Sequence, residues 1–454
     1  MNTLKLLWEL SCLKRNVRKT PAQIKRIQEK KLRRLLAYAF HNSAYHHRAF
    51  VKAGIDENNI KTAPLSAFPV MDKQTLLQHF NEIVTVPDLT QEELRRFDAE
   101  TSADRKPYKG KYHVVHSSGS TGKPGYFVYD EVAWRTMLLG IIRAALWGMS
   151  MPQILRLLAK GPRIAYIAAT DGRYGGAMAV GDGIDGVGAS QIHLDIKQPL
   201  EQWVSKLREY RPNIMIGYPS AIKILGELIE RGQIKLSVTR VISCGEPLGA
   251  GLRDYLETVF SAPVINTYGA SESLALGVEA DSKDGMLLFD DLNVIEVEKG
   301  EMYLTSLYNF AQPLIRYRLS DSLSLSPPNG TPFTRATGLL GRNEDMLWFE
   351  DSLGHRDFLH PLAIEGFCVE GLRDYQFQQT DTDGFVMLAE KTTGSLETVI
   401  QAEIAAQMRG ILEEKGLDYV RFSVEFVHKI LPDPTTGKKR LIVQNNAERW
   451  AKAG

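Results

Sequence analysis

Residues 240–272, RVISCGEPLGAGLRDYLETVFSAPVINTYGASE, decide the fold of this chain. A short apolar run ends at Ser243, an amphipathic segment covers 248–260, and a second apolar run covers 264–267. This order predicts strand, helix and strand, the pattern of βαβ units around a largely parallel sheet. Ligands bind at the carboxyl ends of strands in such sheets. The loops 243–247 and 267–272 are therefore candidate ligand loops.

The same alternation continues on both sides of this stretch. Earlier in the chain the sequence predicts strands at 163–168 and 214–216 and helices at 131–148, 200–210 and 220–231. After about residue 285 shorter strands are expected, such as 301–306 and 314–317. The last hundred residues predict strands at 376–379, 385–389 and 424–427 and a helix at 396–415. We therefore expect an α/β fold with a large N-terminal domain on mostly parallel sheets with flanking helices, and a small α+β C-terminal domain.

Length and composition limit the class of protein. A chain of 454 residues is too long for one ordinary core, and we expect a helical segment at 1–60, a large domain at 61–342 and a small domain at 343–454. A net charge of +1 gives no reason to expect a nucleic-acid partner. The three cysteines form no CxxC pair, and no run of eighteen apolar residues exists, so we expect a cytoplasmic protein without a disulfide framework or an integral membrane segment.

Residues 1–60 are helical in pattern and locally basic. Leu4, Leu7 and Trp8 have helical spacing and form a short apolar stripe. Such a stripe would allow interfacial membrane binding. More often it packs on the core while the charges form a solvated helix face, and both interpretations are kept.

The stretch 115–124, VHSSGSTGKP, has the composition of a loop that wraps a polyphosphate. Glycines let backbone N–H groups approach an anion, and hydroxyls and a cation complete the site. The loop is not a Walker A motif, because only Ser120 and Thr121 separate its glycines and Pro124 follows Lys123. A Gly/Ser-rich connector is the alternative interpretation.

Several motifs occur together in one order. They are the loop 117–124, the turn Gly245-Glu246-Pro247, the loop Tyr268-Gly269-Ala270-Ser271-Glu272, then Asp321, Gly341-Arg342 and Gly437-Lys438. This set resembles the adenylate-forming superfamily of acyl-CoA synthetases, adenylation domains and luciferases. Within it the chain is most similar to the branch of phenylacetate-CoA ligases, coenzyme F390 synthetases and CapK-type proteins.

The resemblance implies how ATP would be held. The phosphates would be bound by Ser117, Ser118, Gly119, Ser120, Thr121, Gly122 and Lys123. Tyr268, in the loop with Gly269, would stack on adenine, with Gly245 and Glu246 forming the opposite wall. Asp321 would accept hydrogen bonds from the ribose hydroxyls.

The resemblance also implies the catalytic groups. Glu272 would bind Mg²⁺, a hard cation that prefers oxygen ligands. Lys438, on a mobile small domain, would be the catalytic lysine, and that domain would swing about a hinge at Glu344. Arg342 would approach the ribose or a phosphate just before this hinge.

The implied reaction is ATP-dependent adenylation of a carboxylate, followed by acyl transfer to a thiol of CoA or of the pantetheine of a carrier protein. The acid is expected to be aromatic or small, with Tyr166, Tyr218 and Ala270 as plausible pocket residues. One alternative is a nucleotidyltransferase, like the F390 synthetases, that leaves AMP on a hydroxyl group. Another is a non-catalytic nucleotide-binding or scaffold protein that has kept the fold.

Overall fold

The structure is a computed structural model of the chain. It describes residues 3–101, 106–116, 125–168, 178–179, 181, 189–246, 248, 250–281, 285–298, 301–319, 321–328, 330–340, 346–351, 353–359, 361–364, 369–391, 394–430 and 441–444. The described chain divides into two compact units. The first contains the described residues up to His193 and those from 210 to 340, and the second contains 194–209 and those from Met346 onward. The expected three-part division at residues 60 and 342 stays a prediction.

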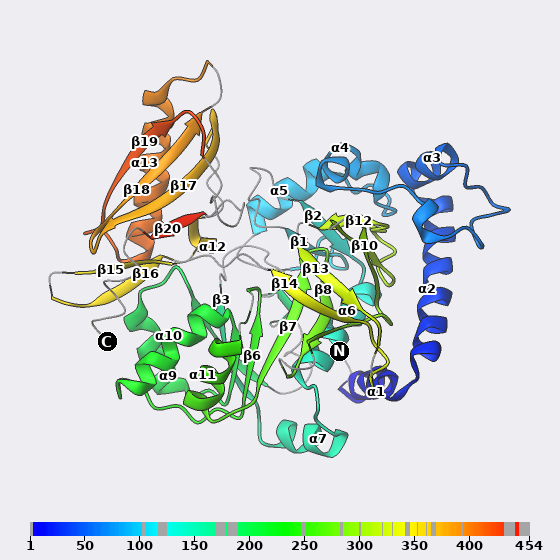
Figure 1. The fold of residues 1–454 in the computed structure, drawn as a ribbon, viewed down its shortest axis with the longest axis horizontal. Coiled ribbons are helices and arrows are strands. Elements are labelled where there is room, and N and C mark those ends of the chain that lie inside the picture. Colours follow the sequence, from blue (N-terminus) through cyan, green and yellow to red (C-terminus); the bar gives the residue numbers. More distant parts are fainter. Residues whose placement is uncertain are drawn as a thin grey trace. The chain divides into compact units, whose positions relative to one another are not determined.

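A nine-stranded sheet organises the first unit (Figure 1). Its order is β13 (Ser322–Ser326), β14 (Arg335–Leu340), β9 (Met286–Leu288), β8 (Ser273–Glu279), β7 (Val264–Ala270), β6 (Arg240–Cys244), β5 (Ile214–Gly217), β3 (Arg163–Ala168) and β4 (Ser190–Asp195). The ladders from β3 to β7 are parallel, and those from β7 to β13 are antiparallel. The predicted α/β class with a parallel-containing sheet is confirmed.

Two smaller sheets complete the strands of the first unit. They are the hairpin of β1 (His113–His116) with β2 (Tyr126–Tyr129), and the meander of β10 (Asn293–Glu298), β11 (Glu301–Ser306) and β12 (Tyr317–Leu319). The strand predicted at 314–317 begins only at Tyr317. Arg316 has a φ of 47°, which a strand residue does not adopt, and its guanidinium donates to the carbonyls of Ser66 and Phe68.

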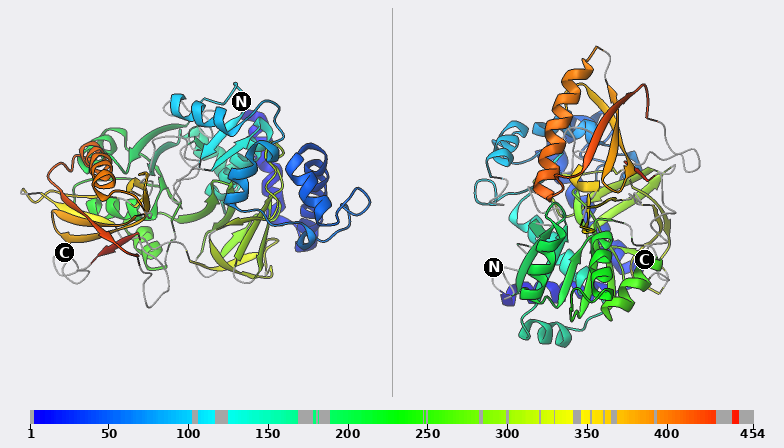
Figure 2. Two further views of the ribbon diagram at one scale, coloured as in Figure 1. Left: turned by 90° about the horizontal axis from the view of Figure 1, so that it is seen from above. Right: turned by 90° about the vertical axis from the view of Figure 1, so that its left-hand side faces the viewer.

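Helices of the first unit pack around these sheets. They are α1 (Thr3–Arg15), α2 (Pro21–Asn42), α3 (Ala44–Lys52), α4 (Lys73–Ile83), α5 (Gln91–Thr101), α6 (Glu131–Ala145), α7 (Met151–Ala159), α10 (Pro219–Glu230) and α11 (Ala250–Phe260), with short 3₁₀ turns at Asn16–Arg18 and Leu65–Ala67. Helix α6 packs on β7 and β8, α1 packs along α6, and α10 packs on α11 and the parallel strands. Helices α2 and α3 stand at the outer edge of the unit in both figures (Figures 1 and 2).

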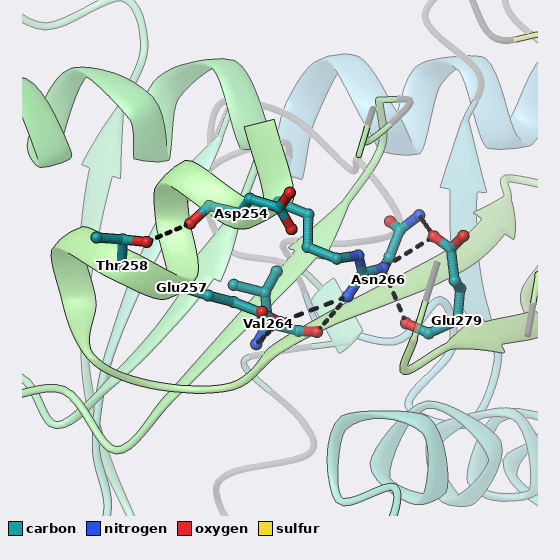
Figure 3. Close-up of polar contacts among 7 residues, drawn as sticks. Asp254, Glu257, Thr258, Val264, Asn266 and Glu279 are labelled. Carbon is teal, nitrogen blue, oxygen red and sulfur yellow. Dashed lines mark hydrogen bonds and ion pairs between the residues drawn. The ribbon is translucent and has the colours of Figure 1, made fainter. Parts of the chain in front are cut away.

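A polar network fixes the start of β7 against α11 (Figure 3). The guanidinium of Arg253, only 3% exposed, donates to the carbonyl of Val264 at 2.6 Å and to the carboxylate of Glu279 at 2.9 Å. The amide of Asn266 donates to the same carboxylate oxygen at 2.9 Å. Because α11, β7 and β8 share these bonds, the start of β7 has a defined position.

The second unit is an α+β arrangement. It contains α9 (Leu200–Tyr210, except for Tyr210), the hairpin of β15 (Leu347–Glu350) and β16 (Arg356–Leu359), α12 (Pro361–Ile364), β17 (Leu372–Asp381), β18 (Gly384–Lys391), α13 (Glu397–Lys415), β19 (Arg421–Val427) and β20 (Ile442–Gln444). The four-stranded sheet has the order β19-β18-β17-β20. One face of α13, formed by Ile400, Ile404, Met408 and Leu412, is buried in the core of this unit. No described helix is long and apolar enough to cross a membrane.

Candidate active site

The candidate site begins where β7 turns into β8. Strand β7 runs three residues further than the sequence predicts, so that Tyr268, Gly269 and Ala270 are strand residues and Ser271-Glu272 form the tight connection to β8. The register shifts between Tyr268 and Ala270. A Cβ at Gly269 would lie 2.5 Å from the carbonyl oxygen of Leu274, so only glycine fits this irregular position.

The neighbouring parallel strands end beside this turn. Gly245, just after β6, has a φ of +80°, and a Cβ there would lie 2.7 Å from the ring of Tyr218, which follows β5. The next residue, Glu246, accepts a hydrogen bond from the backbone N–H of Ser220 at 3.2 Å. Both predicted ligand loops therefore lie at the carboxyl ends of adjacent parallel strands, as expected for a ligand-binding edge.

Tyr268 and Asp321 are joined by a hydrogen bond. The Tyr268 hydroxyl donates to Oδ2 of Asp321 at 2.8 Å. Burial, followed by the nearby Asp321 carboxylate, raises the pKa of Tyr268 well above its usual value. The ring itself is 8% exposed and belongs to the core of the first unit. Stacking of Tyr268 on adenine stays a prediction.

Glu272 has an unusual electrostatic environment. The residue is partly exposed, but the surrounding protein desolvates its carboxyl group, and together with the nearby Asp321 this raises the pKa of Glu272 to about 7. Lys73 and a hydrogen bond from the Tyr317 hydroxyl act in the opposite direction. Two carboxyl groups thus lie close together, and among the residues that the structure describes Lys73 is the cation that acts on Glu272. Sites of this kind attract cations.

The position of Lys73 depends on a short parallel bridge. The N–H of Met71 donates to the carbonyl of Arg316 at 3.1 Å, and the N–H of Arg318 donates to the carbonyl of Met71 at 2.7 Å. This pairing fixes the chain just before α4 beside β12. Tyr317 and Lys73 consequently both act on Glu272, although about 250 residues separate them in the sequence.

The hairpin β1–β2 is bonded to the same turn. The hydroxyl of Tyr129 donates to the carbonyls of Ser271 at 2.9 Å and of Glu272 at 3.0 Å. The hydroxyl of Ser271 donates to the carbonyl of His116, the last residue of β1, at 3.5 Å. Strand β1 ends and β2 begins on either side of the glycine-rich loop 117–124. The chain that enters this loop therefore lies directly beside the turn that carries Glu272.

The donor set can be compared with the needs of a divalent cation. Among the described residues no group of three or more His, Cys, Asp or Glu forms a complete metal site. Mg²⁺ usually binds through one or two carboxylates together with substrate phosphates rather than in an all-protein cage. The partly exposed Glu272, with Asp321 nearby, fits that mode of binding.

The remaining predicted residues differ in their surroundings. Tyr166 is 2% exposed in β3, with its ring edge-on to that of His193, and Tyr218 is 8% exposed. Ala270 packs at the margin of the core beside the Glu272 turn. Their role as a substrate pocket stays a prediction. The predicted residues Ser117, Ser118, Gly119, Ser120, Thr121, Gly122, Lys123, Arg342, Glu344 and Lys438 lie outside the described residues.

Sequence reasoning missed three groups at this site. They are Tyr129, Tyr317 and Lys73. Tyr129 and Tyr317 lie in strands whose aromatic residues resemble ordinary core residues. Lys73 follows Asp72, the N-cap of α4, and so looks like a solvated residue at a helix start. The tertiary pairing with β12 gave the only indication of its position.

The chain has relatives among known proteins. No protein-family profile matches it. A phenylacetate-coenzyme A ligase of Aromatoleum evansii is 25% identical over 348 residues, which cover 72% of each chain. The protein CapK of Staphylococcus aureus is 27% identical over 274 residues, covering 56% of this chain and 58% of its own.

The fold has relatives among solved structures. A 2-hydroxyisobutyryl-CoA ligase, crystallised with its acyl-adenylate and CoA in the thioesterification state, superposes with a TM-score of 0.61 at 20% identity. The match covers 95% of this chain and 91% of that one. These matches confirm the resemblance inferred from the motifs.

Proposed function

We propose that this chain, which is homologous to phenylacetate-CoA ligases and has the fold of adenylate-forming ligases, activates a small carboxylic acid with ATP and passes the acyl group to a thiol. In the first step a carboxylate oxygen of the acid attacks the α-phosphorus of ATP. The bond between the α-phosphorus and the bridging oxygen breaks, and pyrophosphate leaves. In the second step a thiolate attacks the acyl carbon, and AMP leaves.

One observation carries this proposal. The turn that bears Glu272 is hydrogen-bonded, through Tyr129 and His116, to both strands that flank the glycine-rich loop. The strand end that leads into this loop, the strand that follows it and a carboxylate suited to a hard cation are thus bonded together. That combination matches the needs of a polyphosphate with its metal ion, and it supports ATP as the nucleotide.

The chief catalytic problem is that two anions must meet. Bound Mg²⁺ would neutralise phosphate charge, and Glu272 is the residue proposed to hold it. Lys73, beside Glu272, adds positive charge from the first unit, and Lys123 and Lys438 are proposed to add more. Charge neutralisation and alignment of this kind supply most of the rate enhancement in such reactions.

The acceptor proposed here is CoA, with a carrier-protein pantetheine as the alternative. The matches to ligases that use CoA support this choice. An aromatic or otherwise small acid is proposed as the substrate by analogy with the phenylacetate-CoA ligases that the chain resembles. Tyr166 in β3 and Tyr218 just after β5 are candidates for lining its pocket.

Acid-dependent exchange of labelled pyrophosphate into ATP tests the first step. A panel of aryl and short alkyl acids should reveal at least one that supports exchange. Glu272→Gln should slow this exchange on the order of 10²–10³-fold, while the matched variant Glu131→Gln, at the exposed start of α6, should not. A folded protein that binds ATP and shows no exchange with any acid would contradict the proposal.

A lysine variant tests the proposed catalytic residue separately. Lys438→Ala should slow adenylation strongly while ATP binding, measured by calorimetry, changes little. Equal exchange rates in the variant and the wild type would remove Lys438 from the site. Mass spectrometry of the products formed in the presence of CoA identifies the acceptor of the acyl group. A thioester together with released AMP is expected. A stable AMP adduct would instead indicate nucleotidyl transfer to a hydroxyl group.

A further inference from the structure

Helix α1 has two apolar faces, and only one of them is used by the fold. Leu6 and Leu10 are each 2% exposed and pack with Leu139 of α6. On the opposite face, Leu4 is 78% and Trp8 is 65% exposed. Single exposed apolar residues are normal on protein surfaces, but these two lie one helical turn apart and include an indole, which costs most to leave in water.

Basic residues surround this exposed face. At 100° per residue, Arg15 falls between Leu4 and Trp8 around the helix, and Lys5 borders the same face; both are exposed. The register of α1 against α6 adds another apolar residue. Arg135 pairs with Glu9 at 3.2 Å and Arg143 donates to the carbonyl of Leu13, so the two helices run in the same direction. Val132, which is 59% exposed, therefore lies toward the Leu4 end of the pair.

Charge is distributed very unevenly along the chain. Residues 1–42 contain eleven lysines and arginines against two glutamates, a net charge of +9, whereas the whole chain has +1. Three exposed basic residues of α2, Arg26, Lys30 and Arg34, follow one another at intervals of four and form a single stripe. This helix meets α1 through the short turn Asn16–Arg18.

We propose that the exposed face of α1, formed by Leu4, Lys5, Trp8 and Arg15, docks the protein on an anionic lipid surface. Apolar side chains enter the boundary between headgroups and acyl chains, and the basic residues bind lipid phosphates. Nucleic acid would attract the same charges but offers no apolar phase for Leu4 and Trp8. A second copy that presented the same segment would bring its charge of +9 against the +9 of the first. Lipid is therefore the occupant that satisfies both the apolar and the charged residues.

Co-sedimentation with vesicles tests the proposal. We expect the wild type to bind vesicles of phosphatidylcholine with about one third phosphatidylglycerol, to bind pure phosphatidylcholine more than about tenfold less tightly, and to be released by added salt. A blue shift of the tryptophan emission on binding is also expected, because Trp8 leaves water.

Two double variants make the test specific. Leu4→Ser/Trp8→Ser and Lys5→Glu/Arg15→Glu should each weaken binding more than about tenfold. All four residues are exposed and lie outside the candidate active site, so melting temperature and pyrophosphate exchange should stay at wild-type values. Their retention separates loss of docking from loss of fold.

Three results of the vesicle experiments would overturn the proposal. They are absence of binding to anionic vesicles, binding that the Leu4→Ser/Trp8→Ser variant retains, and equal binding to neutral and anionic vesicles. A concentration-dependent dimer that the same variant abolishes, seen by analytical ultracentrifugation, would assign the face to a second copy and would also overturn it. Tight, salt-sensitive binding of a DNA duplex without vesicle binding would assign the charges to nucleic acid instead.

Discussion

Two groups of charged side chains in the first unit have opposite electrostatic environments. In one, Arg143 and Asp291, both fully buried, form two hydrogen bonds of 2.7 and 2.9 Å, and Phe289 lies 4.0 Å from the guanidinium. In the other, the Glu272 and Asp321 carboxyl groups approach each other, with Lys73 as the cation that the structure brings to Glu272. The first group pairs one carboxylate with one guanidinium, whereas the second brings two carboxyl groups together with one described lysine.

The pKa values follow from this difference. Burial alone would raise the pKa of Asp291, but the Arg143 guanidinium and a hydrogen bond from Asn16 hold it below its usual value. Burial raises the pKa of Glu272 to about 7, because its neighbours do not offset the desolvation. Asp291 therefore serves the fold, joining α6 to the N-terminal helices, whereas the described neighbours of Glu272 leave its carboxyl group with a raised pKa, which is typical of functional sites.

Breaking the structural pair should have the largest effect. Arg143→Ala leaves the Asp291 carboxylate buried without its partner, so we expect the free energy of unfolding to fall by about 3–5 kcal/mol. Urea unfolding followed by circular dichroism measures this. Arg143→Lys, which keeps the charge but loses the two-point contact, should cost less. A loss below about 1 kcal/mol in Arg143→Ala would contradict the assigned role.

Glu272→Gln should lower the activity and leave the stability of the fold unchanged. The amide has the same shape but cannot neutralise a cation, so we expect the acid-dependent exchange rate to fall on the order of 10²–10³-fold. Unfolding measurements at pH 8 should show no loss of stability. If the variant keeps exchange activity, Glu272 is not part of the site.

The pH dependence of stability should separate the two carboxylates. The pKa of Glu272 is about 7 when folded and near 4.5 when unfolded, so its ionisation opposes folding. The loss of folding stability caused by this ionisation is absent below pH 4.5, grows between pH 4.5 and 7, and is complete above pH 7. Relative to Glu272→Gln, the wild type should thus lose on the order of 1–2 kcal/mol as the pH rises through this window, after allowance for partial exposure.

Asp291 gives the opposite sign and serves as the internal comparison. Its folded pKa is below the usual value, so its contribution to stability is present above that value and disappears as the pH falls through the folded pKa. The measured quantity is the difference in free energy of unfolding between wild type and variant as a function of pH. If this difference changes with pH in the same direction for Asp291→Asn and Glu272→Gln, the comparison is contradicted.

Replacement of Lys73 tests whether this lysine lowers the pKa of Glu272. Lys73→Met removes the cation beside Glu272, which should raise the pKa of Glu272 and move the acid limb of the exchange pH profile upward, with a rate loss of about tenfold at pH 7. Lys73→Arg should retain most of the profile. An unchanged profile in Lys73→Met would show that Lys73 does not act on Glu272.

The smallest effect is expected at Tyr268. Tyr268→Phe removes the 2.8 Å hydrogen bond to Asp321 and should lower the free energy of unfolding by about 1 kcal/mol. ATP affinity, measured by calorimetry, should fall only a few-fold, because the ring remains. A loss of hundredfold or more would indicate that the hydroxyl itself contacts the nucleotide.

Local sequence features predicted much of the fold. The predicted helix at 200–210 and strand at 163–168 have the observed bounds, because apolar periodicity and capping depend on residues that are near in sequence. Strand ends were less well predicted: β7 continues to Ala270, and the expected strand at 314–317 starts at Tyr317. The first difference arises from the tight hairpin with β8, and the second from the long-range bonds of Arg316 to the chain near Phe68.

For the site, the sequence by itself was enough to predict candidate polyphosphate-binding residues, since the glycine-rich loop, the turn at Gly245 and the stretch 268–272 are contiguous motifs. Only the tertiary structure decided what surrounds Glu272. Its pKa depends on desolvation by distant segments, on Asp321 just before β13, on Tyr317 in β12 and on Lys73 at the start of α4. Electrostatic environment is set by distances in space between residues that lie far apart along the chain, and no pattern of neighbouring residues records those distances.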